Sequence, residues 1–304
     1  MAAVTNPYAA HCPACHGEAV TTSLHRLVDI ERYPITEPGS PAWQAEVDRT
    51  RGELARVGCR VLPEFISGDA LADLRAEGAR IAPLAYYDVE TVNAYNIDVR
   101  TPLPPEHPGR ITLERGNAFV ARDRIPADAI IHRLYTSPLF QRFVAACFDL
   151  PRLHELADPL SGLVLNVVDP GRSHPWHFDV NEFTVSMLTQ APEQGGEFQY
   201  CPNIRSAEDE NFADVRSVLD GAGERLIHRL VLRPGDLQLF QGRYALHQVS
   251  TVHGTRARHT AIFAYSERQG VLGSVARTRQ LFGRVLPEHL AAERDAVRVD
   301  ELLD

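Results

Sequence analysis

The first half of the chain contains three stretches in which apolar side chains recur every three or four positions. In the first stretch, Trp43, Val47 and Leu54 fall on one side of a helix. Proline near its start suits a first helical turn, where no amide proton is needed. Ser67 is placed to act as the N-cap of the second stretch. The pattern therefore predicts helices over residues 41–57, 67–81 and 137–149.

The second half of the chain has a different pattern of apolar and turn-forming residues. From Leu163 to Tyr265, short apolar runs alternate with Gly, Pro and Asp, which is typical of strands joined by tight turns. An acidic insertion, 203–228, interrupts the runs and is partly helical by pattern. About eight short strands preceded by helices predict a mainly β fold with N-terminal helices, a double-sheet jelly roll of the cupin type.

Composition narrows the class of protein. The chain has 304 residues, 44% of them hydrophobic, and a formal net charge of −9. This acidic balance disfavours a nucleic-acid partner, because phosphate binding needs clustered positive charge. No apolar run is long enough to span a bilayer, and the N-terminus lacks a secretory pattern. Five cysteines do not suggest a disulfide framework, and we expect a cytoplasmic protein.

We expect one globular domain with additional segments at its termini. Residues 1–40 are predicted to form an N-terminal arm that can be flexible, and 41–304 a single domain. Within that domain, the helical part covers 41–150, the jelly-roll core 160–266 and a helical tail 267–304. In the arm, Cys12 and Cys15 lie close to two histidines, so a metal role and a mobile segment are both open.

The chemistry is concentrated in the segment from Ser173 to Asn181. There, His177 and Asp179 are two residues apart, and on an extended strand such residues point to the same face. A third candidate ligand, His247, follows 70 residues later. Two imidazoles and one carboxylate leave coordination positions open, which is typical of non-haem Fe(II) oxygenases.

After the distal histidine come two arginines and a hydroxyl residue. Arg258 lies eleven residues beyond His247, and Thr260 lies two residues further on. A guanidinium can bind a carboxylate through two hydrogen bonds. This ordered set, His-x-Asp, a distal His, then Arg-x-Ser/Thr, resembles the Fe(II)/2-oxoglutarate-dependent oxygenase superfamily over roughly residues 160–266.

The resemblance implies a double-stranded β-helix and a dioxygenase that uses Fe(II), 2-oxoglutarate and O2, with ascorbate able to support turnover. It implies that His177, Asp179 and His247 bind the iron. It also implies that an arginine pairs with the far carboxylate of 2-oxoglutarate, with Arg258 our first choice and Arg256 our second. By strand parity both point to one face. Additional contacts to the cosubstrate are expected from Thr260 and Asn166.

The same resemblance extends to the reaction. Halogenases of the superfamily have Gly or Ala where Asp179 stands, which opens a position for chloride. The carboxylate here favours hydroxylation of an unactivated C–H bond, with succinate and CO2 as co-products, and desaturation is an alternative.

A closer resemblance, carried by His174-Pro175-Trp176-His177 and its neighbours, is to the bacterial group that halogenates or hydroxylates free amino acids. In that group the histidine three positions before the metal ligand can contact the substrate, which implies this role for His174; orienting His177 is the alternative. Arg115 is a candidate for a substrate carboxylate or a solvated side chain. Ile262 is apolar where a lysine-selective pocket calls for a polar group. The expected substrate is thus a small molecule such as a free amino acid.

Two other classes of function stay open. The first is an oxygenase that acts on a peptide or a carrier-bound substrate, which nothing in the sequence opposes. The second is a metal-binding cupin-like protein without oxygenase activity. The intact Arg258-x-Thr260 pattern disfavours the second class, because a metal-binding protein does not need a cosubstrate arginine.

Overall fold

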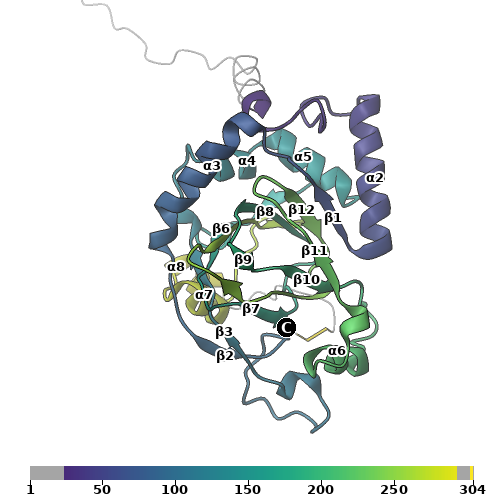
Figure 1. Ribbon diagram of the computed structural model, residues 1–304, viewed down its shortest axis with the longest axis vertical. Coiled ribbons are helices and arrows are strands. Elements are labelled where there is room, and N and C mark those ends of the chain that lie inside the picture. The colour runs from purple at the N-terminus through teal and green to yellow at the C-terminus, as the bar shows by residue number, and fades with distance from the viewer. Residues whose placement is uncertain (1–23, 293–301, 304) are drawn as a thin grey trace, which may run out of the picture.

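The computed structural model describes residues 24–292, 302 and 303 of the chain. Its centre is a pair of antiparallel sheets (Figure 1). The larger sheet has the strand order β1 (Cys59–Leu62), β12 (Leu237–Phe240), β8 (Thr184–Gln190), β15 (Arg258–Phe263), β6 (Leu163–Val168), β4 (Ala118–Val120). The smaller sheet has the order β11 (His228–Leu230), β10 (Phe198–Cys201), β13 (Leu246–Val249), β7 (His174–His177).

The chain passes back and forth between these two sheets. It leaves β6 in the larger sheet for β7 in the smaller one, returns to β8, and crosses again to β10 and β11. The same alternation follows through β12, β13 and β15. Eight strands wound in this way form a double-stranded β-helix, which confirms the predicted jelly roll. Three two-stranded ribbons complete the set: β14 (Val252–His253) with β9 (Gln194–Gly195), β16 (Tyr265–Ser266) with β5 (His154–Glu155), and β2 (Glu90–Val92) with β3 (Leu113–Arg115).

The helices flank the sheets. The α-helices are α2 (Pro41–Val57), α3 (Gly68–Ile81), α4 (Ile130–Tyr135), α5 (Pro138–Cys147), α6 (Phe212–Leu219), α7 (Val275–Phe282) and α8 (Pro287–Ala292). Four short 3-10 helices are η1 (Ala82–Leu84), η2 (Pro108–Arg110), η3 (Arg122–Arg124) and η4 (Glu224–Leu226). Helices α2 to α5 gather at one side of the larger sheet, and α7 and α8 lie apart from them (Figure 1).

The three helices expected from periodicity are present. Helix α2 has the predicted bounds; the side chain of Ser40 caps its first turn, and Gly58 ends it in a left-handed conformation. Helix α3 follows Ser67, and α5 follows Ser137, whose hydroxyl accepts from the amide of Phe140. Their apolar faces pack with the larger sheet into the main hydrophobic core.

The segment just before α2 differs from the expected arm. Leu24, Val28 and Ile35 are buried in the main core, and Val28 pairs with Ile66 through an isolated β-bridge. Residues 24–40 therefore belong to the packed domain, because their apolar side chains cover the edge of the core. The Cys12 and Cys15 pair lies outside the described residues, and the division of the chain into parts otherwise stays a prediction.

Strands β2, β3 and β4 were not predicted from the pattern of apolar residues, because a three-residue strand offers too few positions for alternation to be visible.

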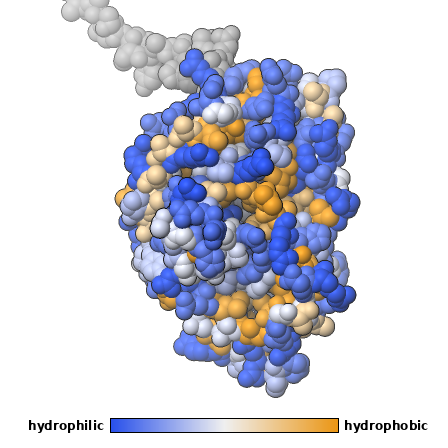
Figure 2. Space-filling model, viewed as in Figure 1, coloured by the Kyte–Doolittle hydropathy of each residue, from blue (hydrophilic) through white to orange (hydrophobic). Residues whose placement is uncertain are grey.

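On the surface seen in Figure 2, hydrophobic residues gather near the middle of the face and towards its lower end, and hydrophilic residues cover most of the rest. Among the residues that the structure describes, no helix combines the length and the apolar character needed to cross a bilayer.

Candidate metal centre

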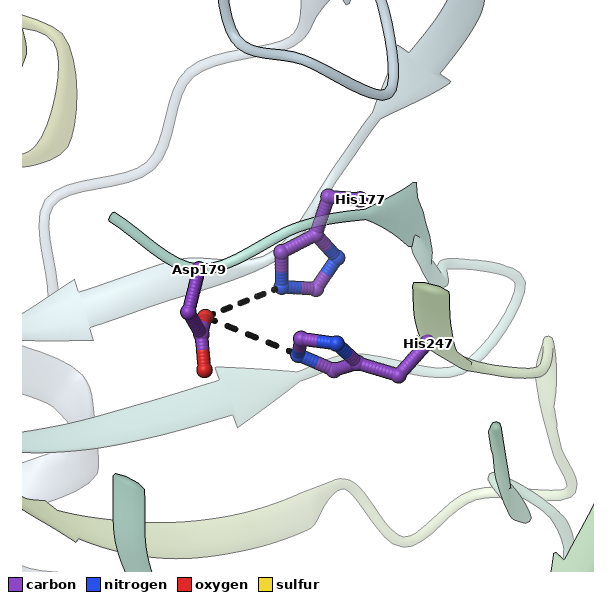
Figure 3. Close-up of side chains that lie close together, drawn as sticks. All are labelled: His177, Asp179 and His247. Atoms are coloured by element: carbon purple, nitrogen blue, oxygen red, sulfur yellow. Dashed lines mark ion pairs between the residues drawn. The ribbon is translucent and has the colours of Figure 1, made fainter. Parts of the chain in front are cut away.

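Three side chains converge at one end of the smaller sheet (Figure 3). Nε2 of His177 lies 3.7 Å from Oδ1 of Asp179, and Nε2 of His247 lies 3.5 Å from the same oxygen. Donors that each sit about 2.0–2.2 Å from a shared ion are at most about 4.4 Å apart, so these separations suit one metal. Of the described residues, this is the group of His, Cys, Asp and Glu that can hold an ion.

Backbone carbonyls fix the orientation of both imidazoles. Nδ1 of His177 lies 2.7 Å from the carbonyl oxygen of Pro175, and Nδ1 of His247 lies 2.9 Å from that of Ala245. Nδ1 must carry the proton to donate these bonds, which leaves the lone pair of Nε2 for a metal. The two histidines are also direct partners in the pairing of β13 with β7. The sheet register therefore brings together two residues that are distant in sequence.

Asp179 is held differently, because β7 ends at His177 and the aspartate follows the strand. Its amide donates to the carbonyl of Gly242 at 3.1 Å, and the hydroxyl of Thr184 donates to its Oδ2 at 2.6 Å. A Cβ on Gly242 would lie only 2.0 Å from that oxygen. The carboxylate thus needs glycine at 242. Neither supporting residue was predicted from the sequence, although Gly242 lies only five residues before His247.

The protonation states suit metal binding. Burial and, to a smaller extent, the nearby His247 together lower the pKa of His177 to about 3. Burial alone would raise the pKa of Asp179, but the two histidines and the hydroxyl of Thr184 outweigh it and hold that pKa below its usual value. A neutral imidazole and an ionised carboxylate are the forms that coordinate a divalent cation.

His174 lies beside this centre because of a bulge in β7. Strict alternation would turn residues 174 and 177 to opposite faces. However, the pairing shifts between His247, opposite His177, and Val249, opposite His174, so β7 holds one extra residue there. The His174 ring consequently stacks on His177, with centroids 3.9 Å apart. Its imidazole lines the cavity next to the metal centre, and burial lowers its pKa well below the usual value.

The centre opens into a cavity of about 990 Å³ between the two sheets. On one wall, Arg258 and Thr260 project from β15, and Asn166 stands directly opposite Thr260 on β6. Arg258 donates to the Thr260 hydroxyl and forms no ion pair with the described residues. Burial lowers its pKa to about 10, so it stays cationic at neutral pH. Asn166 accepts from Nδ2 of Asn117 at 3.0 Å.

Arg256 does not reach this cavity. Its side chain is exposed, and Nε donates to the carbonyl of Ala191 at 2.9 Å. Alternation along a strand does not apply to Arg256, because β15 begins only at Arg258 and Arg256 lies in the irregular segment that follows a bend at residues 254–255. Our second choice for the cosubstrate arginine is therefore not supported by its position.

Arg115 is neither solvated nor open to the cavity. Only 3% of its side chain is exposed, and Nη2 pairs with Oε2 of Glu90 at 2.5 Å. The pairing of β3 with β2 places these two residues opposite each other. Glu90 lines the cavity, whereas Arg115 stands behind it. The expected direct grip on a substrate carboxylate is thus replaced by an ion pair. Arg277 of α7, which was not predicted from the sequence as a site residue, does line the cavity.

The chain is similar to one family of known proteins and to several solved structures. The family model described as Halogenase D matches residues 110–280, which is more than half of the chain. A search of curated proteins found no match. Among solved structures, AviO1 from Streptomyces viridochromogenes Tue57 is similar, with 17% identity, a TM-score of 0.50, and coverage of 74% of this chain and 96% of that one.

Two further solved structures are similar at lower TM-scores. A 2OG-Fe(II) oxygenase family oxidoreductase from Burkholderia pseudomallei shares 19% identity, with a TM-score of 0.47 and coverage of 74% of this chain and 92% of that one. EctD from S. alaskensis, solved with 2-oxoglutarate and 5-hydroxyectoine, shares 17% identity, with a TM-score of 0.46 and coverage of 72% and 75%. At such identities, the likeness to AviO1 supports the fold alone.

Proposed function

This chain belongs to the Halogenase D family, and from that membership and its site we propose that it is an Fe(II)/2-oxoglutarate-dependent dioxygenase that hydroxylates a small molecule. The observation that carries the proposal is the position of the His177, Asp179 and His247 group in the same cavity as Arg258. A metal centre with open positions and a buried cation, Arg258, that has no ion-pair partner among the described residues together suit a dicarboxylate cosubstrate.

The third ligand position supports hydroxylation rather than halogenation. Asp179 supplies a carboxylate there, and Thr184 and Gly242 are shaped around it. A halide needs that coordination position to be free of a protein ligand. In this family member, the carboxylate and its supporting contacts therefore favour transfer of oxygen to the substrate.

The residues around the centre have separate tasks in this reaction. Bound Fe(II) with 2-oxoglutarate and O2 supplies the oxidising power that breaks an unactivated C–H bond, with succinate and CO2 as co-products. His177 and His247 present Nε2 because their Nδ1 protons are held by backbone carbonyls. Arg258 and Thr260 bind the far carboxylate of 2-oxoglutarate by charge-assisted hydrogen bonds, and Asn166 borders the same end of the cavity.

The cavity itself supports a small substrate such as a free amino acid. Its volume of about 990 Å³ lies at the upper end of the range for small-molecule sites, enough for a cosubstrate and a substrate together. Next to the metal centre, neutral His174 can accept a hydrogen bond from a substrate or donate one to it. These features also distinguish the protein from a metal-binding jelly roll, which needs no such cavity.

The test is an anaerobic optical titration of Arg258→Gln with Fe(II) and 2-oxoglutarate. We expect the variant to need roughly 10–100-fold more 2-oxoglutarate to form the charge-transfer band, because a charge-assisted carboxylate contact worth about 1.5–3 kcal/mol is lost. Iron binding should stay close to that of the wild type. Arg256→Gln is the matched control, since it removes the same charge from an exposed position two residues away.

Three results contradict the proposal. Absence of the band in the wild-type protein with bound iron indicates a metal-binding protein without cosubstrate chemistry. A larger effect of Arg256→Gln than of Arg258→Gln shows that Arg258 is not the arginine that binds the cosubstrate. Chlorination of a substrate by the wild type in the presence of chloride contradicts the role of Asp179.

A further inference from the structure

A buried arginine lies directly behind the segment that carries two of the metal ligands. Arg205 belongs to the acidic insertion between β10 and α6, and its side chain is fully buried. Its guanidinium carbon lies 3.8 Å from the ring centroid of Phe178, the residue between His177 and Asp179. Phe178 is buried as well. A cation so close to an aromatic face is attracted by the ring quadrupole, most strongly where water is excluded.

The same guanidinium also contacts the other segment of the metal centre, which runs from Gly242 to His247. Nε of Arg205 donates to the carbonyl oxygen of Arg243 at 2.7 Å. The residue before Arg243 is Gly242, whose carbonyl accepts from the amide of Asp179 at 3.1 Å. Arg205 therefore joins the two chain segments between which the Asp179 carboxylate is held.

A second set of contacts fixes the position of Arg205 itself. Its Nη1 pairs with Oε2 of Glu210 at 3.0 Å and donates to the carbonyl oxygen of Leu303 at 3.2 Å. The other carboxylate oxygen of Glu210 accepts from the amide of Leu303 at 2.6 Å. Leu302 is buried, and Leu303 packs against the hydrophobic cluster that contains Phe178. Residues 302 and 303 therefore complete the contacts of the guanidinium from a part of the chain 98 positions away.

The burial of Arg205 has a cost that indicates its role. Its Nη2 is buried and has no hydrogen-bond partner among the described residues. Buried polar groups are nearly always paired, so an unpaired one opposes folding unless other contacts offset it. An arginine that served only to pair with Glu210 would lose nothing in solvent, where water satisfies every N–H group. The burial of Arg205 therefore indicates that the fold maintains its contact with Phe178.

We propose that Arg205 is a positioning residue of the metal centre, which acts on Asp179 through the Phe178 ring and the Arg243 carbonyl, and that residues 302 and 303 hold it in place. This inference rests on the proposed oxygenase function, since it concerns the iron ligands. The aspartate depends on such support more than the histidines do. Their rings are fixed within a paired sheet, whereas Asp179 follows the end of β7.

The first experiment measures the equilibrium binding of Fe(II) under anaerobic conditions, together with the melting temperature of the metal-free protein. We expect Arg205→Gln to bind Fe(II) roughly 10–100-fold more weakly than the wild type, because residues that support metal ligands contribute about that much to metal affinity. Arg205→Lys should recover part of the loss. It keeps a cation near the Phe178 ring but cannot reach the ring, the Arg243 carbonyl and Glu210 with one rigid fork.

Arg60→Gln is the matched control. Arg60 is also largely buried, pairs with the carboxylates of Glu46 and Glu53, and has an Nε that lacks a partner among the described residues. None of these three residues lines the cavity. We expect Arg60→Gln to lower the melting temperature about as much as Arg205→Gln does, and to bind Fe(II) as the wild type does.

The second experiment removes residues 302–304 by ending the chain after position 301. This truncation deletes the backbone groups of Leu303 that contact Arg205 and Glu210. We expect Fe(II) affinity to fall by roughly tenfold, less than in Arg205→Gln, because the contacts with Phe178 and Arg243 remain. In the truncated chain, Arg205→Gln should cause little further loss, since the two changes act on the same contacts and are not additive.

The outcomes separate this inference from the proposed function. If the wild type does not bind Fe(II), the oxygenase proposal fails and this inference fails with it. If the wild type binds Fe(II) and Arg205→Gln binds it equally well, only the positioning role is wrong. An equal loss of Fe(II) affinity in Arg60→Gln reduces the effect to general destabilisation.

The role of residues 302 and 303 has its own test. Full additivity of the truncation and Arg205→Gln contradicts their link to the arginine. If Arg205→Gln does not fold, Arg205→Lys and the truncated chain decide the question, and unchanged Fe(II) affinity in both overturns the proposal.

Discussion

Two walls of the same cavity, the strand pair β7–β13 and the helix α7, are built by different means. On the strands, His177 and His247 are direct partners in a sheet, and backbone carbonyls hold both rings. On the helix, Arg277 and Leu281 are presented by a short element that follows the jelly roll in the chain. Helix α7 contacts the edge strand β4, and the segment that leads into it is tied down by Asp158.

We expect the two walls to have different tasks, the strands in the reaction and the helix in contacts with the substrate. Metal ligands have to keep their relative positions within a fraction of an ångström, and a paired sheet register provides that constancy. A helix at the edge of the fold can change its side chains without altering the register of the strands. We therefore expect changes in the strand wall to affect iron and the reaction itself, and changes around α7 to affect the substrate.

The largest effect is expected in the strand wall. His177→Ala or His247→Ala removes one of the two imidazole ligands and should reduce iron-dependent succinate formation by at least about 1000-fold. Iron content and succinate are measured on the same preparations. Near-normal succinate formation in either variant would contradict the assignment of these residues as iron ligands. Lost turnover with an unchanged melting temperature would support it, because the fold is then intact.

A smaller but specific effect is expected at Gly242. In Gly242→Ala, the new Cβ would lie 2.0 Å from Oδ2 of Asp179, so the carboxylate has to move away from the metal position. We expect iron affinity and turnover to fall by roughly 100-fold. Gly52→Ala in α2, where nothing lies within 4 Å, is the control and should stabilise the fold by about 0.5–1 kcal/mol. Unchanged iron affinity in Gly242→Ala would show that the carboxylate has room.

The contribution of the helix α7 is tested by a change at Asp158, which holds the segment that leads into this helix. Asp158 is fully buried, accepts from the amides of Leu160, Ser161 and Gly273, and lies 3.1 Å from Nε2 of His289 in α8. Asp158→Asn should lower the free energy of unfolding by about 3 kcal/mol, because hydrogen bonds from backbone amides and from His289 to a buried carboxylate are weakened or lost. It should also weaken substrate binding while iron binding stays normal. Asp128→Asn, which is exposed, is the control.

The contribution of Asp158 to the stability of the fold should depend on pH in a defined direction. Burial alone would raise the pKa of Asp158, but the backbone amides outweigh it and lower that pKa below 3.8. The ionised carboxylate therefore stabilises the fold above its unfolded pKa, and this contribution is lost as the pH falls through the folded pKa. Urea unfolding between about pH 5 and pH 2 should show a shallower decline for Asp158→Asn than for the wild type. An equal decline in both proteins would contradict the depressed pKa.

Most of the secondary structure and a candidate group of metal ligands could be predicted from the sequence alone. Local spacing was sufficient for α2, α3 and α5, because amphipathic periodicity is a property of consecutive residues. The short apolar runs with turn residues between them were sufficient for the jelly roll. The close pair His177 and Asp179 was visible for the same reason, and its resemblance to a known family supplied His247 as the partner.

The surroundings of these candidate ligands could not be predicted from the sequence and depend on the tertiary structure. The bulge in β7 turns His174 towards the metal centre, and the start of β15 at Arg258 leaves Arg256 on the surface. Arg115 is occupied by Glu90, and Arg277 reaches the cavity from a helix beyond the last strand of the jelly roll. These facts depend on strand register and on contacts between distant segments. No local pattern contains them, since the residues concerned meet only after the chain has folded.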